Sequence, residues 1–217
     1  MDSKVLVGQI AEKHVVVGEE SGGWSKKSYG PSSMSIVLIE TTRPYEFARI
    51  SEHYPRNTRG THNDKELKWV SSSDRIRKKV LRDIAELGPD IYIATDERSE
   101  LNIKNDERYR ILFKMAAEEL ILNTRADHID FVIDETPLMK EGRGRLIIKD
   151  IIGSKTFGYR HVRSVDAPLV QTQDFVAGAA NRAREAGDNR FIKMVNKRII
   201  SWEIQERTAL EIPWREL

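Results

Sequence analysis

Short apolar runs of strand length alternate in this chain with segments of helical periodicity, and this alternation most constrains how the chain can fold. The runs lie at 14–18, 35–40, 90–95 and 128–134. Strands that alternate with helices indicate an α/β fold around one sheet. Because no helical segment separates the first two runs, we expect those two strands to pair antiparallel before the β-α alternation begins. The sequence therefore predicts a mixed β-sheet flanked by helices.

Capping residues predict where the helices begin and end. One helix should follow the hydroxyls of Ser71–Ser73 and stop at Gly88–Pro89, and a second should cover 106–123. A late helix should run from an N-cap at Asp166, with Pro168 in its first turn, to Gly187.

The remaining segments give weaker signals. A further strand is expected at 145–152, a loop at 54–64 and a strand-like segment at 199–204. A chain of 217 residues favours one domain. We therefore expect a single domain over 1–217, with a core at about 13–188 and a C-terminal extension at 189–217.

Composition excludes several classes of protein. The charged fraction of 32% and the hydrophobic fraction of 39% are typical of a globular chain rather than a disordered one. No apolar run reaches the roughly 20 residues that a membrane-spanning helix needs, and the start lacks the layout of a signal peptide. The chain has no cysteine, which excludes disulfides, cysteine-zinc sites and thiol catalysis. We expect a cytoplasmic protein without a membrane partner.

Pairs of acids follow three of the expected strands, at Glu19–Glu20, Asp96–Glu97 and Asp134–Glu135. The carboxyl ends of parallel strands gather at one edge of a sheet, where ligands bind. Converging carboxylates repel one another unless cations neutralise them, and hard divalent ions suit such all-oxygen sites. This pattern indicates one or two Mg²⁺ or Mn²⁺ ions that act on a phosphodiester. Taken singly, each acid is also compatible with a turn or a helix cap.

Asp174 stands out because it falls in the apolar part of the late helix. An ionised carboxylate on an apolar surface is costly unless something pairs with it, and Asp is a poor helix former away from the caps. Two interpretations stay open. Asp174 either joins the acids at the strand ends or forms a buried salt bridge with a neighbouring Arg or Lys.

Four short motifs occur in a fixed order, namely VVVGEESG (15–22), ELKW (66–69), FVIDET (131–136) and VQTQDFVAGA (170–179), and EAGD (185–188) follows them. They resemble the motifs of the domain of unknown function family numbered 3800, which is assigned to the ribonuclease H-like superfold. The resemblance runs from about Val15 to Phe191. It implies a ribonuclease H-like fold and a metal-dependent nuclease.

Carried over position by position, the resemblance implies that four acids bind metal and are catalytic: Glu19, Glu66, Asp134 and Asp174. Lys68 would be a nearby phosphate or carboxylate partner. The chain has Glu19 where the family has Asp, which could shift a metal ion or abolish tight two-ion geometry. Gln173 and Val170 are smaller departures. In ribonuclease H-like enzymes the second strand-end acid usually follows the first helix, which nominates Asp96 as an alternative to Asp134.

Basic residues are clustered although the net charge is only +2. Clusters occur at 75–79 and 142–145 and in the C-terminal tail, and such patches are compatible with phosphate backbones. Solvated helix faces are the simpler explanation. The candidate nucleic-acid contacts are Lys68, Arg143, Arg145 and Arg182.

The leading hypothesis is a metal-dependent nuclease or phosphodiesterase whose partner is nucleic acid, with self-association as a further expectation. The alternative is a module of the same fold that binds nucleic acid or protein without catalysis. A third hypothesis is that the acids only form buried ion pairs with Lys68 and the arginines. A zinc site at His53, His62 and Glu66 is disfavoured because the chain has no His-x-x-x-His pair.

Overall fold

The computed structural model describes residues 14–22, 33–54, 67–96 and 104–205. Six strands form one sheet in the order β5-β4-β1-β2-β3-β6. Strand β2 is antiparallel to both of its neighbours, and the other neighbouring pairs are parallel. The predicted mixed sheet is confirmed. The strands are β1 (His14–Gly22), β2 (Met34–Thr41), β3 (Asp90–Asp96), β4 (His128–Asp134), β5 (Thr156–Val162) and β6 (Ile199–Gln205).

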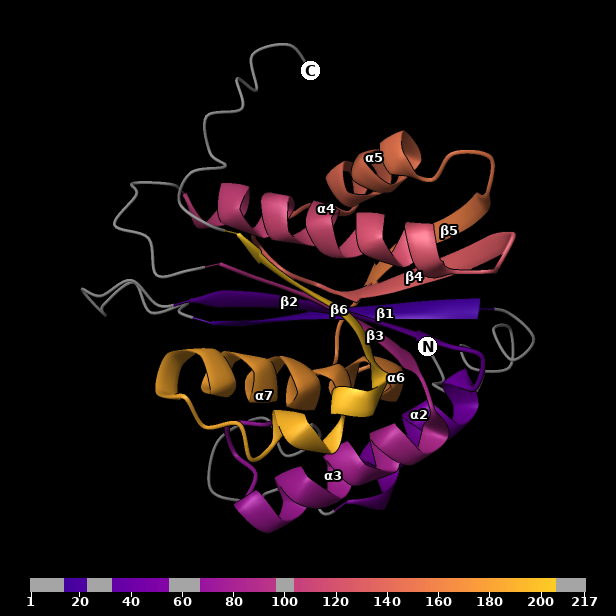
Figure 1. Cartoon of the computed structure of the whole chain (residues 1–217). Coiled ribbons are helices and arrows are strands. Elements are labelled where there is room, and N and C mark those ends of the chain that lie inside the picture. The colour runs from indigo at the N-terminus through magenta and orange to yellow at the C-terminus, as the bar shows by residue number, and fades with distance from the viewer. Residues whose placement is uncertain (1–13, 23–32, 55–66, 97–103, 206–217) are drawn as a thin grey trace.

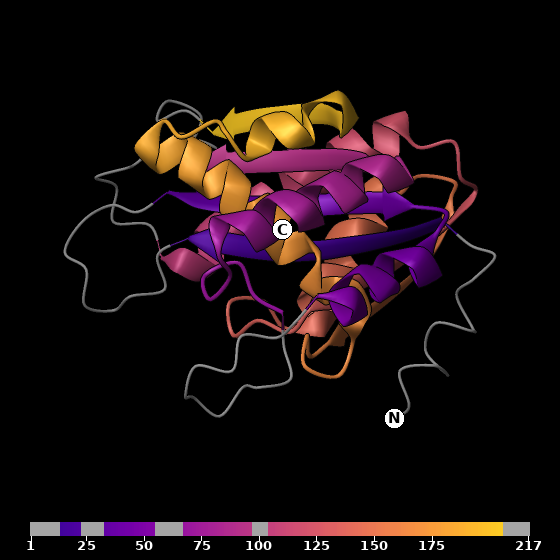
Figure 2. The same ribbon diagram turned by 90° about the horizontal axis from the view of Figure 1, so that it is seen from below.

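Helices cover both faces of the sheet, as predicted (Figure 1). One face carries α4 (Asn105–Asn123) and α5 (Glu141–Ile151). The other carries four helices, which lie in front of the sheet when it is viewed from below (Figure 2): α2 (Pro44–His53), α3 (Asp74–Leu87), α6 (Pro168–Gln171) and α7 (Gln173–Ala186). Two 3₁₀ turns, η1 (Ile192–Met194) and η2 (Asn196–Arg198), lead into β6.

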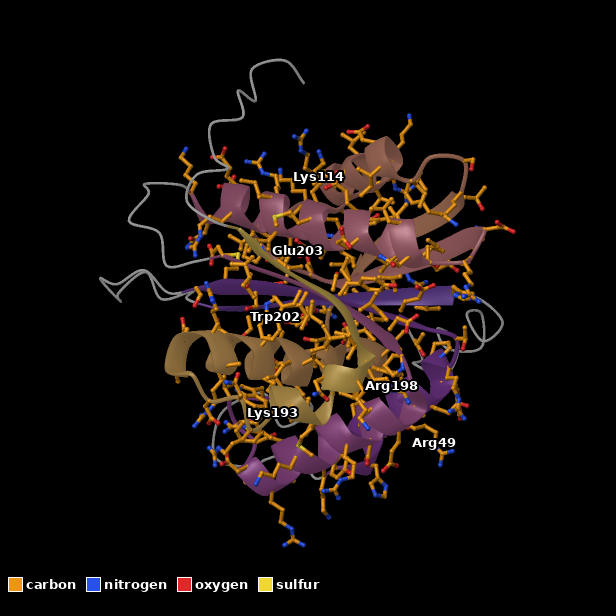
Figure 3. All side chains as sticks on the ribbon, viewed as in Figure 1. Arg49, Lys114, Lys193, Arg198, Trp202 and Glu203 are labelled. Carbon is orange, nitrogen blue, oxygen red and sulfur yellow. The ribbon has the colours of Figure 1, made fainter. Side chains whose placement is uncertain are left out.

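The strands contribute alternately to two cores. In β2, Val37 and Ile39 belong to the core beneath α7, whereas Ile36 and Leu38 belong to the core beneath α4. At the edge of the sheet, Figure 3 shows Trp202 of β6 on the α7 side. This period of two follows from strand geometry. It also decides on which face of the sheet each strand-end acid lies.

Predicted helix ends are confirmed for α3. The hydroxyl of Ser73 accepts a hydrogen bond from the Ile76 amide at 3.4 Å, and Gly88 ends the helix in the left-handed conformation with φ 72°. The strand predicted at 145–152 is wrong, because residues 145–151 belong to α5 and Ile152 is its C-cap. Ile148 and Ile152 are buried four residues apart, which is a helical spacing that a short apolar run does not reveal.

The C-terminal stretch 189–217, predicted as an extension, supplies β6 to the sheet and Phe191 to the α7 core. The strand-like segment predicted at 199–204 is therefore confirmed as β6. Of the loop predicted at 54–64, all but the first residue lies outside the described residues. None of the helices described is long and apolar enough to cross a membrane.

The late helix predicted as continuous over 166–187 is divided at Thr172 into α6 and α7. Pro168 is the first residue of α6, as its fixed φ favours. Asp174 is consequently the second residue of α7 and does not lie mid-helix. A carboxylate in the first turn of a helix is stabilised by the unpaired backbone N–H groups there. Part of the expected cost of burying Asp174 is thereby offset.

Candidate active site

Glu19 and Asp134 lie side by side at the carboxyl end of the β1–β4 pair. Gly18 is in register with Ile133 in this parallel pair, so the next residue of each strand is an acid. Val17 and Val132, two positions earlier, both belong to the core beneath α7. The two acids therefore project from the same face of the sheet.

The two carboxyl groups share a hydrogen bond. Two ionised carboxylates cannot do so, and thus one of them carries a proton. Burial raises the pKa of Glu19 well above its ordinary value, and the negative charges of Asp134, Glu20 and Asp174 raise it further. Glu19 is accordingly the group that donates, and Asp134 accepts.

Asp134 is fixed by the backbone around it. Its Oδ1 accepts hydrogen bonds from the Ser164 amide at 2.8 Å and from the Glu135 amide at 3.0 Å. Burial raises the pKa of Asp134, while the bond from Glu19, these two amides and the charge of Lys68 act to lower it. Lys68 is thus the cation that the described structure places near Asp134.

Asp174 reaches the same region from α7. Its Oδ2 accepts a hydrogen bond from the Trp69 amide at 2.7 Å, and its charge raises the pKa of Glu19. Trp69 approaches α7 closely because residue 178 is glycine. A Cβ at Gly178 would lie 2.4 Å from Cγ of the indole. The small residues after Asp174 therefore provide room for the Trp69 ring.

Glu20 follows Glu19 but projects toward the other face of the sheet, because it pairs with Ile36 of β2, which belongs to the core beneath α4. Burial raises its pKa to about 7; the hydrogen bond with Thr136 opposes this shift, and the charges of Asp134 and Asp174 add to it. Its Oε2 is buried and has no hydrogen-bond partner among the described residues. Glu20 is therefore a neighbour of the acidic site and faces Tyr109 of α4 rather than Asp174.

Asp96, the alternative to Asp134, lies elsewhere. Tyr92 and Ala94, four and two positions earlier in β3, belong to the core beneath α4, which places Asp96 on the opposite face of the sheet from Asp134. Its Oδ2 accepts a hydrogen bond from Nε of Arg108 at 2.6 Å, and its Oδ1 accepts one from the Met34 amide at 2.6 Å. Asp96 therefore forms a structural ion pair. Glu66 lies outside the described residues.

The basic residues predicted to bind nucleic acid are dispersed. Arg143 is exposed in the first turn of α5, and Arg145, also exposed, donates to the Tyr159 carbonyl at 2.8 Å. Arg182 donates to Asp188 at 2.7 Å. Of the four, only Lys68 lies with the acids.

No histidine joins the acids in the described part of the chain. His53 ends α2 and is exposed, with its ring against Tyr54. His62 lies outside the described residues. The described residues therefore add nothing in favour of a zinc site.

The acids suit a hard divalent ion by their chemistry but do not yet enclose one. Within the described ranges, no three His, Asp or Glu side chains stand close enough to hold a metal ion. Yet Glu19, Asp134 and Asp174 offer only oxygen donors, which Mg²⁺ and Mn²⁺ prefer. A cation could neutralise the paired carboxyl groups of Glu19 and Asp134. The chemistry of these donors suits such an ion, and their present spacing does not enclose one.

No family model matches the chain, and no curated protein matches it. Solved structures that match it include a chain of the PCNA:RNase HII complex from Archaeoglobus fulgidus, at 13% identity and a TM-score of 0.49 over 82% of this chain and 78% of that one. Ribonuclease H2 from Pyrococcus horikoshii OT3 matches at 12% identity and a TM-score of 0.45 over the same shares. The six-stranded mixed sheet with helices on both faces agrees with the predicted α/β architecture. Likenesses this distant carry no argument about activity.

Proposed function

We propose that this chain is a metal-dependent nuclease that hydrolyses phosphodiester bonds, with Glu19, Asp134 and Asp174 as its metal-binding acids. The observation that carries the proposal is the pairing of the Glu19 and Asp134 carboxyl groups at the ends of β1 and β4, with Asp174 and Lys68 near enough for their charges to act on the pair. Two buried carboxyl groups this close together need either a proton or a cation between them. A metal ion can take the place of the proton.

One further acid belongs to the proposal. The resemblance to family 3800 nominates Glu66 as a ligand, and in the sequence Glu66 comes just before Lys68 and Trp69. Glu20 is not a ligand in this proposal, because it pairs with Ile36 of β2 and projects toward the α4 face of the sheet. Membership of family 3800 and a cytoplasmic location are part of the same proposal.

In this proposal the metal ion, the acids and Lys68 have separate roles. Bound Mg²⁺ or Mn²⁺ would supply positive charge that activates water and stabilises the charge developing on the phosphate. Asp134, held by two backbone amides, and Asp174, held by the Trp69 amide, keep their oxygens in fixed positions. Lys68 would bind a non-bridging phosphate oxygen. Arg143 and Arg145 on α5 would follow the nucleic-acid backbone beyond the site.

The proposal is tested with Asp134→Asn and Asp174→Asn, and Asp96→Asn serves as the matched control. We expect Mn²⁺-dependent cleavage of labelled DNA, RNA or their hybrid by the natural chain. Each site variant should lose roughly 10²–10⁴-fold in rate, since a metal ion contributes several kcal/mol of transition-state stabilisation. Asp96→Asn should keep the rate. Full Mn²⁺-dependent cleavage by both site variants would remove the proposal.

A second candidate function is nucleic-acid binding without catalysis. It is favoured by Glu19 in the place of the family's Asp, and by the lack of a ready group of three ligands within the described ranges. Calorimetry separates the two functions. Salt-sensitive binding of nucleic acid without Mn²⁺ binding would support the binding module, whereas tight Mn²⁺ binding with multiple turnover would exclude it.

A further inference from the structure

Gln171, the last residue of α6, connects two segments that are far apart in the sequence. Its side chain is 2% exposed. Oε1 accepts a hydrogen bond from the Leu67 amide at 3.2 Å, and Nε2 donates one to the Ser164 carbonyl at 2.7 Å. One amide group thus joins the segment before α3 to the turn after β5.

Both of these segments hold the acidic site. Leu67 directly precedes Lys68, and Ser164 donates its amide hydrogen to Asp134 at 2.8 Å. Gln171 therefore binds Leu67, the residue next to Lys68, and Ser164, the residue whose amide binds Asp134. Asp174 accepts a hydrogen bond from the amide of Trp69, the residue after Lys68. The segment around Lys68 is therefore held at both Leu67 and Trp69.

The two bonds need the side chain of glutamine. The Leu67 amide requires an acceptor and the Ser164 carbonyl requires a donor, and the glutamine amide offers both in one uncharged planar group at any pH. Asparagine offers the same pair but is one methylene shorter, and glutamate has no donor when ionised. The division at Thr172 ends α6 at Gln171, where the side chain reaches both segments.

We propose that Gln171 is a positioning residue of the acidic site: it fixes Lys68 and Asp134 relative to each other without touching the metal or the phosphate. The proposal rests on the proposed function. A group that orients metal ligands from outside the ligand set typically changes metal affinity or activity by 10–100-fold when it is removed.

Gln173 provides a matched control. It is a glutamine in the next helix, it is 0% exposed, and its side chain faces the carbonyls of Leu169 and Val170 in α6, so its contacts stay within the helix pair. Gln171→Met and Gln173→Met both remove a buried amide and keep its length. A general effect on the stability of α6 and α7 should be similar in the two variants.

The test compares Mn²⁺ affinity and amide hydrogen exchange in the full chain. Gln171→Met should bind Mn²⁺ about 10–100-fold more weakly, and its amides around 67–69 and 163–165 should exchange faster. Gln173→Met should change neither. Equal weakening in both variants, or wild-type Mn²⁺ affinity in Gln171→Met, would overturn the proposal.

Two further results are decisive. If the natural chain itself binds no Mn²⁺, the proposed nuclease function is wrong. The role of Gln171 is then decided by the hydrogen-exchange data alone. Faster exchange confined to the two segments in Gln171→Met would support the positioning role, and unchanged exchange would overturn it. If Gln171→Met does not fold, Gln171→Glu, which keeps the acceptor for Leu67 and loses the donor, takes its place with the same expected direction.

Discussion

Asp96 and Asp134 occupy equivalent positions in the sheet and have opposite surroundings. Each is the last residue of its strand, and each accepts at least one backbone amide hydrogen. Asp96 faces Arg108 beneath α4, and that ion pair neutralises it. Asp134 faces the Glu19 carboxyl beneath α7, and the two are hydrogen-bonded. An acid at a strand end is therefore a candidate metal ligand only where no arginine of the protein already neutralises it.

Burial raises the pKa of both aspartates, so burial alone does not distinguish them. What differs is the partner that the chain supplies. An arginine is permanently charged and fills the ion-pair position, whereas a proton can be exchanged for a metal ion. Changes at Arg108 and Glu19 test this difference between the two aspartates, and a change at Gly178 tests how firmly Asp174 is held on the Asp134 side.

The largest effect is expected from Arg108→Met. This change leaves Asp96 buried without its cation, which should lower the free energy of unfolding by about 3–5 kcal/mol, as measured by urea denaturation. Mn²⁺ affinity should stay the same, because Asp96 lies on the other face of the sheet from Asp134. The double variant with Asp96→Asn should recover part of the loss. A loss below about 1 kcal/mol would show that Asp96 is not neutralised as described.

A smaller effect is expected from Gly178→Ala. The new Cβ would meet the indole of Trp69 at 2.4 Å, and overpacking of this kind costs about 1–3 kcal/mol. Because the Trp69 amide binds Asp174, Mn²⁺ affinity should fall together with the melting temperature. Gly142→Ala is the control, since a Cβ there meets nothing within 4 Å. Equal stability of the two variants would mean that the Trp69 ring does not need a glycine at position 178.

The smallest effect concerns pH. Because the pKa of Glu19 is raised in the folded protein, the folded state binds this proton more tightly than the unfolded state. The metal-free protein should therefore lose stability as pH rises from the ordinary Glu range through the raised pKa of Glu19. Glu19→Gln should flatten this slope and add about 0.5–2 kcal/mol at neutral pH, measured by urea denaturation in EDTA. An unchanged slope would place the proton elsewhere.

The sequence predicted the elements whose signals are local. Strand-length apolar runs marked β1 to β4, and Ser73 and Gly88 marked the ends of α3, because period and capping act over a few residues. The segment 145–152 was misassigned because its apolar run fits a strand and a helix equally well. Strand β5, with sequence TFGYRHV, was missed because its apolar residues are few and it is only partly buried.

The site depended on non-local information. The resemblance nominated Asp134, but only the strand order shows why, since β4 is the neighbour of β1 and β3 is not. Gln171 could not be found from spacing, because its partners lie about a hundred residues upstream and in the turn after β5. Glu19 and Glu20 are adjacent in the sequence, and only the pairing of β1 with β2 shows that Glu19 faces α7 and Glu20 faces α4.

The parallel pairing of β1 with β4 also determines when the site can form during synthesis. Val16 pairs with Phe131, more than half the chain later, and contacts of such long range form slowly. Domains fold largely as units while the ribosome extends the chain. A nascent chain that ends before α7 contains Glu19 and Asp134 but lacks Asp174 and the helix that covers them. The acidic site is thus completed only after α7 has been synthesised.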